Sequence, residues 1–190
     1  MKIGKIIRNP YPVSLIVDIH DFCNARCKMC PYGKLHKRLI QGKMEWDLYT
    51  KIIDDFSQLT KKYNFRGVMT YCNMGEPFLE ERLFMYTNYA EERGIYVYIN
   101  TNASVMYPHK IDFLIKSGFK GNFNISFHAA TKDLYEDLMG INQNESINNI
   151  KYLLTKYPKE KITINALNYN WPEDEERKIK AFLSIFYQGI

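Results

Sequence analysis

The stretch IYVYINTNASVMYPHKIDFLIKSGFKGNFNISFH, residues 95–128, contains a complete strand–helix–strand unit and decides the fold class. Residues 95–100 and 123–128 are short apolar runs typical of strands. Between them, Ile111, Leu114 and Ile115 share one face of a helix that should end before Gly118. A helix that connects two neighbouring strands makes them parallel. This unit therefore predicts an α/β fold.

The same order of elements repeats along the whole chain. Further strands are expected at residues 13–19, 67–72 and 161–167. Further helices are expected at residues 48–59, from residue 79 to a stop at Gly94, and at residues 147–154 and 172–186. The last helix should open at Pro172, with the acidic residues 173–176 in its first turn, where the helix dipole favours them. Five strand–helix units in 190 residues fall short of a complete eight-unit barrel, which needs about 250 residues. We expect one domain over residues 1–190 that is a partial barrel, or a fragment that lacks its last strand and any later domain.

Composition places the chain among soluble globular proteins. Hydrophobic residues make up 46% and charged residues 25%, and the net charge of +5 comes from scattered side chains. The sequence has no apolar run of about 18 residues, and its start lacks the apolar core of a secretory signal. We expect a cytoplasmic protein with neither a membrane nor a nucleic acid as partner.

Polar side chains alternate with apolar ones in the later strands. Asn122, Asn124, Ser126 and His128 share one face of their strand, and Thr163 and Asn165 share one face of the next. If the apolar faces pack against the helices, the polar faces line a lumen that could hold a polar ligand. A one-sided sheet with its polar face in water is the alternative, but it suits antiparallel sheets better.

Three of the four cysteines occur in CNARCKMC, as Cys23, Cys27 and Cys30, directly after the first expected strand. The carboxyl end of a strand is where α/β folds assemble active sites. Three thiolates at this spacing can hold three corners of a cuboidal iron–sulfur cluster and leave one iron open. The alternatives are a zinc site completed by His20 or His36, or an accidental group of free thiols.

With these cysteines the sequence resembles the radical S-adenosylmethionine (radical SAM) enzymes, whose signature is C-x3-C-x2-C after the first strand of a partial (β/α)6 barrel. In that family the cysteines bind a 4Fe-4S cluster, and the open iron is chelated by the amino and carboxylate groups of S-adenosylmethionine. The reduced cluster cleaves this cofactor to methionine and a 5'-deoxyadenosyl radical, which abstracts hydrogen from a substrate. The resemblance thus implies one cluster, S-adenosylmethionine, and a reductant protein such as flavodoxin or ferredoxin.

The segment after the second expected strand carries another part of the resemblance. Met74-Gly75-Glu76-Pro77 is similar to the family's G-G-E-P, with Met74 replacing the first glycine. The family's glutamate and backbone hold the methionine amino group, as suits a carboxylate and a glycine that permits close approach. Met29, between the second and third cysteines, stands where the family carries a usually aromatic residue beside the adenine. The resemblance implies cofactor binding by Met29, Gly75, Glu76 and Pro77.

The later strands carry the remaining matches. Thr101-Asn102-Ala103 is similar to the family's T-N-G, with alanine in place of glycine. Ser126 and His128 match the segment that meets the ribose and the methionine carboxylate, and Asn165 has the family's polar position on the fifth strand. The resemblance implies cofactor binding by Asn102, Ser126, His128 and Asn165. A histidine that only completes a polar lumen is the alternative for His128.

The stretch ISFHAATKDLYEDLMG, residues 125–140, looks most like the branch with the peptide-maturing SPASM enzymes and the molybdenum-cofactor cyclases. Those relatives carry auxiliary clusters, for which Cys72 alone is too few ligands. We expect hydrogen abstraction from an unidentified substrate, a peptide or a small metabolite, and no residue is singled out as catalytic. A glycyl-radical activase and a non-catalytic zinc module remain as alternatives.

Overall fold

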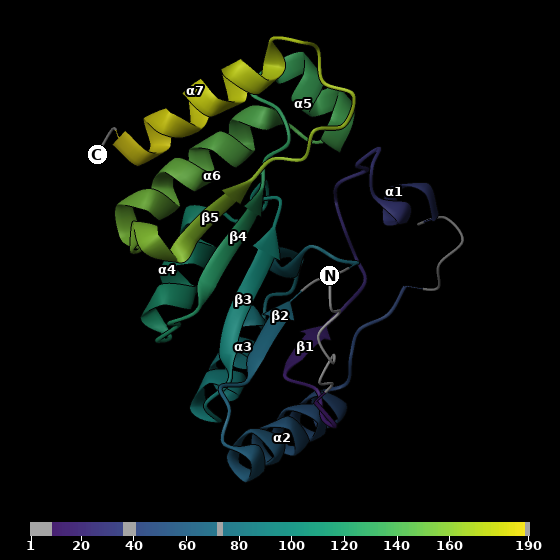
Figure 1. The fold of residues 1–190 in the computed structure, drawn as a ribbon, viewed down its shortest axis with the longest axis vertical. Helices are drawn as coiled ribbons and strands as arrows, with labels where there is room; N and C mark the ends of the chain where they lie inside the picture. Colours follow the sequence, from purple (N-terminus) through teal and green to yellow (C-terminus); the bar gives the residue numbers. More distant parts are fainter. Residues whose placement is uncertain (1–8, 36–40, 72–73, 189–190) are drawn as a thin grey trace, which may run out of the picture.

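A computed structural model of the chain describes residues 9–35, 41–71 and 74–188. Its centre is a five-stranded sheet in the order β1-β2-β3-β4-β5, and every neighbouring pair is parallel (Figure 1). The strands are β1 (Ser14–Val17), β2 (Val68–Tyr71), β3 (Tyr96–Thr101), β4 (Asn122–Ser126) and β5 (Ile162–Asn165). The α/β class and the parallel order expected from the strand–helix repeat are confirmed, and a single open sheet is consistent with a partial barrel.

Helices connect the strands. They are α1 (Pro31–Leu35), α2 (Trp46–Tyr63), α3 (Leu83–Glu92), α4 (Pro108–Lys116), α5 (Lys132–Met139), α6 (Gln143–Lys156) and α7 (Glu175–Gln188), with short 3-10 turns η1 (Pro77–Leu79) and η2 (Lys159–Lys161). Helices α2, α3, α4 and α6 form one layer, each packed on the next, while α1 lies apart on the other side of the sheet (Figure 1). None of the helices in the described part of the chain is long and apolar enough to span a membrane.

The sheet has one buried face and one partly open face. Val97 and Ile99 of β3 are fully buried, as are Phe123 and Ile125 of β4, and strand pairing aligns Ile99 with Phe123. The side chains between them are only half-buried, and there Asn100 lies opposite Asn124. The alternation seen in the sequence therefore places the apolar side chains against the helices and leaves a polar face for a ligand.

Three helix predictions need correction. Leu79 belongs to η1 and not to the helix with Leu83, because Glu80 is extended and its carboxylate accepts a hydrogen bond from Arg82 N. The last helix begins at Glu175, so Pro172 and residues 173–174 form a turn before it. Helix α5 is absent from the sequence prediction, because its eight residues show little more than two turns of periodicity.

Some predicted positions lie outside the described residues. They are His36, Cys72, the chain end at 189–190, and the side chain of Phe186.

Candidate cofactor site

The loops at the carboxyl ends of the strands surround a cavity of about 380 Å³. All three cysteines of the motif open onto it. The other lining residues come from the cysteine loop, from the ends of β2 to β5 and from α5: Ala25, Gly75, Glu76, Asn100, Thr101, Asn102, Asn124, Ser126, His128, Met139 and Asn165. Segments far apart in the sequence therefore meet where parallel sheets place active sites.

Helix α5 supports the cysteine loop. Arg26 N donates to Met139 O at 3.0 Å and Lys28 N to Leu138 O at 2.8 Å, so the loop satisfies the carbonyls at the end of this helix. On the other side, Gly33 of α1 lies so close that a Cβ there would be 2.6 Å from Cys27 O. The loop is thus held between α5 and α1, with its thiols toward the cavity.

The thiols are half-buried, and burial raises the pKa of Cys23 to about 11 and of Cys27 to about 12. Without a metal the thiols of Cys23 and Cys27 are protonated, and iron would displace their protons because thiolates are the ligands. Three thiols spread around one cavity suit a cuboidal cluster, whose irons occupy separate corners. Residues and cofactor therefore fit.

The zinc alternative fits less well. Among the described residues, no group of three or more His, Cys, Asp or Glu side chains converges as a site for a single metal ion. His20 is 2% exposed, does not line the cavity, and accepts a hydrogen bond from Phe22 N at its Nδ1. It is therefore not placed as a fourth ligand to the cysteines.

Glu76 is a buried carboxylate at the edge of this cavity. Its Oε1 accepts from Thr101 Oγ1 at 2.7 Å, and its Oε2 accepts from Asn102 N at 2.8 Å. Burial raises its pKa to about 7, although these hydrogen bonds oppose the shift. Gly75 brings it there, because a Cβ at residue 75 would lie 2.6 Å from His20 O. Oε1 also accepts from Phe78 N at 3.2 Å, so about one lone-pair position of the carboxylate remains for a cationic ligand.

His128 is oriented by the segment after β5. Its Nδ1 accepts from Leu167 N at 3.2 Å, and its carbonyl accepts from Trp171 Nε1 at 2.9 Å. Burial lowers the pKa of His128, so the ring is neutral near pH 7 and carries its proton on Nε2. Ser126 and Asn165 lie opposite each other in the pairing of β4 with β5. This corner of the cavity offers neutral donors and acceptors.

Nine of the eleven predicted site residues line the cavity together. Met29 and Pro77 do not: Met29 packs half-buried against the core, and Pro77 is buried at the start of η1. The sequence interpretation missed Asn24 and Ser104, which hydrogen-bond to Asn102 or to each other. The place of Asn24 inside the cysteine motif was the available signal.

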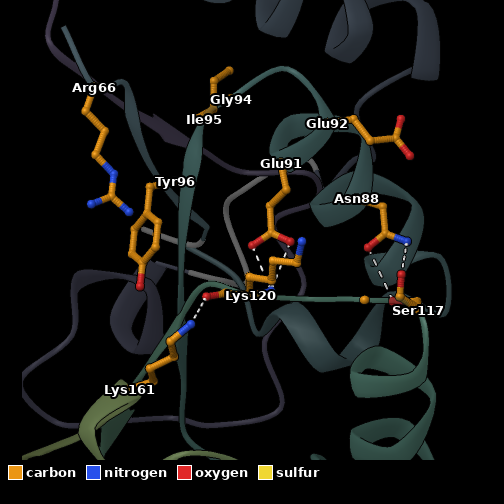
Figure 2. A pocket seen from close by; sticks show the side chains of 11 residues that line it. Arg66, Asn88, Glu91, Glu92, Gly94, Ile95, Tyr96, Ser117, Lys120 and Lys161 are labelled. Carbon is orange, nitrogen blue, oxygen red and sulfur yellow. Dashed lines mark hydrogen bonds between the residues drawn. The ribbon is translucent and has the colours of Figure 1, made fainter.

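A second cavity of about 420 Å³ lies at the amino ends of the strands (Figure 2). There Glu91 accepts from Lys120 N at 3.0 Å, Lys161 Nζ donates to Lys120 O at 2.6 Å, and Arg66 lies 4.1 Å from the centre of the Tyr96 ring (Figure 2). These polar groups stabilise the starts of strands and the end of α3. The amino end of such folds usually serves stability.

Comparison with known proteins identifies the family of the chain. The sequence matches the radical SAM superfamily over residues 17–182, and the chain belongs to this superfamily. Its members are enzymes that use a 4Fe-4S cluster and S-adenosylmethionine, with a reductant and a substrate as partners.

Three relatives illustrate the likeness. A tungsten-containing aldehyde ferredoxin oxidoreductase cofactor-modifying protein of Pyrococcus furiosus is 29% identical over 104 residues, which is 55% of this chain and 28% of the relative. The structure of Streptococcus suis SuiB bound to the precursor peptide SuiA has a TM-score of 0.67 at 19% identity, covering 93% of this chain and 38% of SuiB. The structure of BtrN in complex with AdoMet and 2-DOIA has a TM-score of 0.62 at 21% identity, covering 84% of this chain and 58% of BtrN. The chain thus spans only part of the length of each.

Proposed function

We propose that residues 1–190 are the catalytic core of a radical SAM enzyme that cleaves S-adenosylmethionine reductively and abstracts hydrogen from a substrate. The observation that carries this proposal is the meeting of three thiols and a buried carboxylate around one cavity: Cys23, Cys27, Cys30 and Glu76. When bound, the reduced cluster supplies one electron that splits the cofactor into methionine and a 5'-deoxyadenosyl radical, which takes a hydrogen atom from the substrate.

The chain's own residues bind and orient the reactants. Cys23, Cys27 and Cys30 would hold the cluster and leave its fourth iron without a ligand among them. Glu76, presented by Gly75, would receive the cofactor's ammonium, and an adjacent positive charge would favour the ionised carboxylate. Such roles are what the superfamily's chemistry requires of the protein. The cofactor carries out the difficult step, and the protein binds and orients it.

The polar corner would position the rest of the cofactor. His128 Nε2–H is a neutral donor suited to a ribose hydroxyl or the methionine carboxylate, and Ser126 and Asn165 lie beside it. Asn100 and Asn124, joined by a hydrogen bond of 3.0 Å, extend the polar lining down the open face of the sheet. The polar lining of this face favours a polar substrate, such as a peptide or a small metabolite.

The proposal is tested by anaerobic reconstitution with iron and sulfide, followed by detection of 5'-deoxyadenosine after addition of S-adenosylmethionine and a one-electron reductant such as dithionite or flavodoxin. We expect about four irons per chain and formation of 5'-deoxyadenosine that stops when reductant is omitted. Protein that binds zinc without iron or sulfide would contradict the proposal.

A further inference from the structure

Three side chains beside the cysteines form a closed ring of hydrogen bonds. Asn24 Nδ2 donates to Ser104 Oγ at 2.8 Å, Ser104 Oγ donates to Asn102 Oδ1 at 2.7 Å, and Asn102 Nδ2 donates to Asn24 Oδ1 at 3.1 Å. Each member donates once and accepts once within the ring. Hydrogen bonds in such a chain polarise and strengthen one another.

The ring joins two loops that are far apart in the sequence. Asn24 follows Cys23 in the cysteine loop, whereas Asn102 and Ser104 belong to the loop after β3, 78 and 80 residues further along. Among the described residues, these are the hydrogen bonds that connect the two loops directly. The other anchors of the cysteine loop lead elsewhere: to α5 through Arg26 N and Lys28 N, and to the loop after β2 through Phe22 O.

Burial makes the ring energetically important. Ser104 is fully buried and Asn102 is 7% exposed, so a broken ring would leave polar groups without partners away from water. The loop after β3 is also held from α6, because Asn149 Nδ2 donates to Ala103 O at 2.8 Å and to Ser104 O at 3.1 Å. The β3 loop thus has an attachment to α6 that does not pass through the ring, and Asn24 connects the cysteine loop to the β3 loop through the ring alone.

The same β3 loop holds the carboxylate of the site. Asn102 contributes its side chain to the ring and its backbone N–H to Glu76 Oε2, at 2.8 Å. Glu76 N in turn donates to Phe22 O, just before Cys23, at 2.7 Å. A continuous path of short hydrogen bonds thus runs from the cysteine loop through the ring to Glu76.

We propose that Asn24 and Ser104 are positioning residues that set the cysteine loop, and with it the open iron of the cluster, at a fixed place relative to Glu76. The inference rests on the proposed function, because it concerns where the cofactor's amino end and the iron meet. Neither residue needs to touch the cofactor. Asn102 contributes to the same positioning, because its side chain belongs to the ring and its backbone N–H donates to Glu76.

The experiment uses reconstituted protein and compares Asn24→Ala and Ser104→Ala with the wild type. In each protein, iron and sulfide are counted, and the EPR spectrum of the reduced cluster is recorded while S-adenosylmethionine is added. We expect iron content within about twofold of wild type, but about tenfold more S-adenosylmethionine to produce the spectral change, since one lost buried hydrogen bond of about 1.4 kcal/mol corresponds to tenfold.

Asn149→Ala is the matched control, because it loosens the same β3 loop from the α6 side and leaves the ring intact. We expect it to lower thermal stability without moving the midpoint of the S-adenosylmethionine titration.

Equal midpoints in wild type and both ring variants would overturn the inference, and so would a shift in Asn149→Ala as large as that in the ring variants. Loss of the cluster from both ring variants, with unchanged circular dichroism, would instead assign the ring to cluster assembly and also overturn it. If the wild type itself gives no spectral change, the proposed function fails.

Discussion

The two ends of the sheet carry cavities of similar volume, about 380 Å³ at the carboxyl ends of the strands and about 420 Å³ at the amino ends, but their polar groups do different things. At the amino end, Glu91 and Lys161 form hydrogen bonds to the backbone of Lys120. These polar groups therefore stabilise the fold at the start of β4. At the carboxyl end, thiols and side chains from several loops face the cavity, and buried networks hold them there. The two volumes are too similar to distinguish the cavities, whereas the chemistry of their linings differs.

The largest effect should come from the cysteines. We expect Cys27→Ala to abolish cluster binding, because the cluster would keep only two of its three thiolate ligands and no other cysteine of the described residues lines the cavity. Arg66→Ala, which alters only the amino-end cavity, should leave the cluster intact. Iron content and the visible absorbance of the reconstituted protein are measured for both variants. An intact iron–sulfur absorbance in Cys27→Ala would refute the cluster assignment.

The support of the cysteine loop should matter almost as much. In Gly33→Ala, the new Cβ would lie 2.6 Å from Cys27 O and 3.2 Å from Arg26 C, and backbone atoms cannot move aside cheaply. We expect a several-fold loss of bound iron with little change in circular dichroism. Gly42→Ala is the matched control, because a Cβ there meets nothing within 4 Å. Equal iron content in the two variants would show that the α1 contact does not hold the loop.

Glu76 should give the cluster-free protein a characteristic pH dependence. Its pKa in the folded chain is raised to about 7 from an ordinary 4.5, so the folded state binds the proton more tightly than the unfolded state. The contribution of Glu76 to the free energy of unfolding should therefore fall by about 3 kcal/mol as pH rises from about 4.5 to about 7, and level off above that.

Urea unfolding of the cluster-free protein at several pH values measures this contribution. Glu76→Gln should remove that part of the slope, whereas Glu92→Gln, at an exposed side chain of the amino-end cavity, should keep it. Identical slopes for Glu76→Gln and wild type would mean that the carboxylate is not the group that titrates.

The smallest effect concerns the β3 loop. Ala103 has a φ of 62°, a left-handed conformation that costs alanine about 1–2 kcal/mol. Glycine there would relieve the strain but lose a buried methyl group, so we expect Ala103→Gly to change the free energy of unfolding by less than about 0.5 kcal/mol.

The matched variant is Ala90→Gly, at an equally buried alanine in α3, near the amino-end cavity. It should cost about 2 kcal/mol, because it loses both the methyl group and helix propensity. Denaturant titrations of the two variants give the comparison. A cost at residue 103 as large as that at residue 90 would show that the strain is absent.

Much of the fold and of the candidate site was predictable from short-range patterns in the sequence. The strand–helix order followed from the spacing of apolar residues such as Ile111, Leu114 and Ile115, and the parallel sheet followed from that order. The parity of Asn124 and Ser126 placed them on the ligand face, where both line the cavity. Helix α5 and the start of α7 were missed or misplaced, because eight residues show little more than two turns of periodicity and Pro172 suits a turn as well as a helix.

The roles of Asn102, Met29 and Pro77 show where such reasoning stops. Asn102 lines the cavity and its contact with the cofactor stays a prediction, but its amide also hydrogen-bonds Asn24 and Ser104, which the motif did not indicate. Met29 and Pro77 do not line the cavity. Position in a motif gives a residue's place along the chain, whereas the direction of its side chain depends on the loops packed against it.

By itself, the sequence determined the fold class, the group of three thiols, the carboxylate that follows the second strand and the polar face of the sheet. These depend on spacing within a few residues, which the periods of helix and strand convert directly into faces. Only the tertiary structure decided that α5 and Gly33 hold the cysteine loop and that Asn24 joins it to the loop after β3. Those contacts connect residues as much as 113 positions apart, such as Arg26 and Met139, and their hydrogen bonds exist only once the register of the sheet and the conformation of every loop are set.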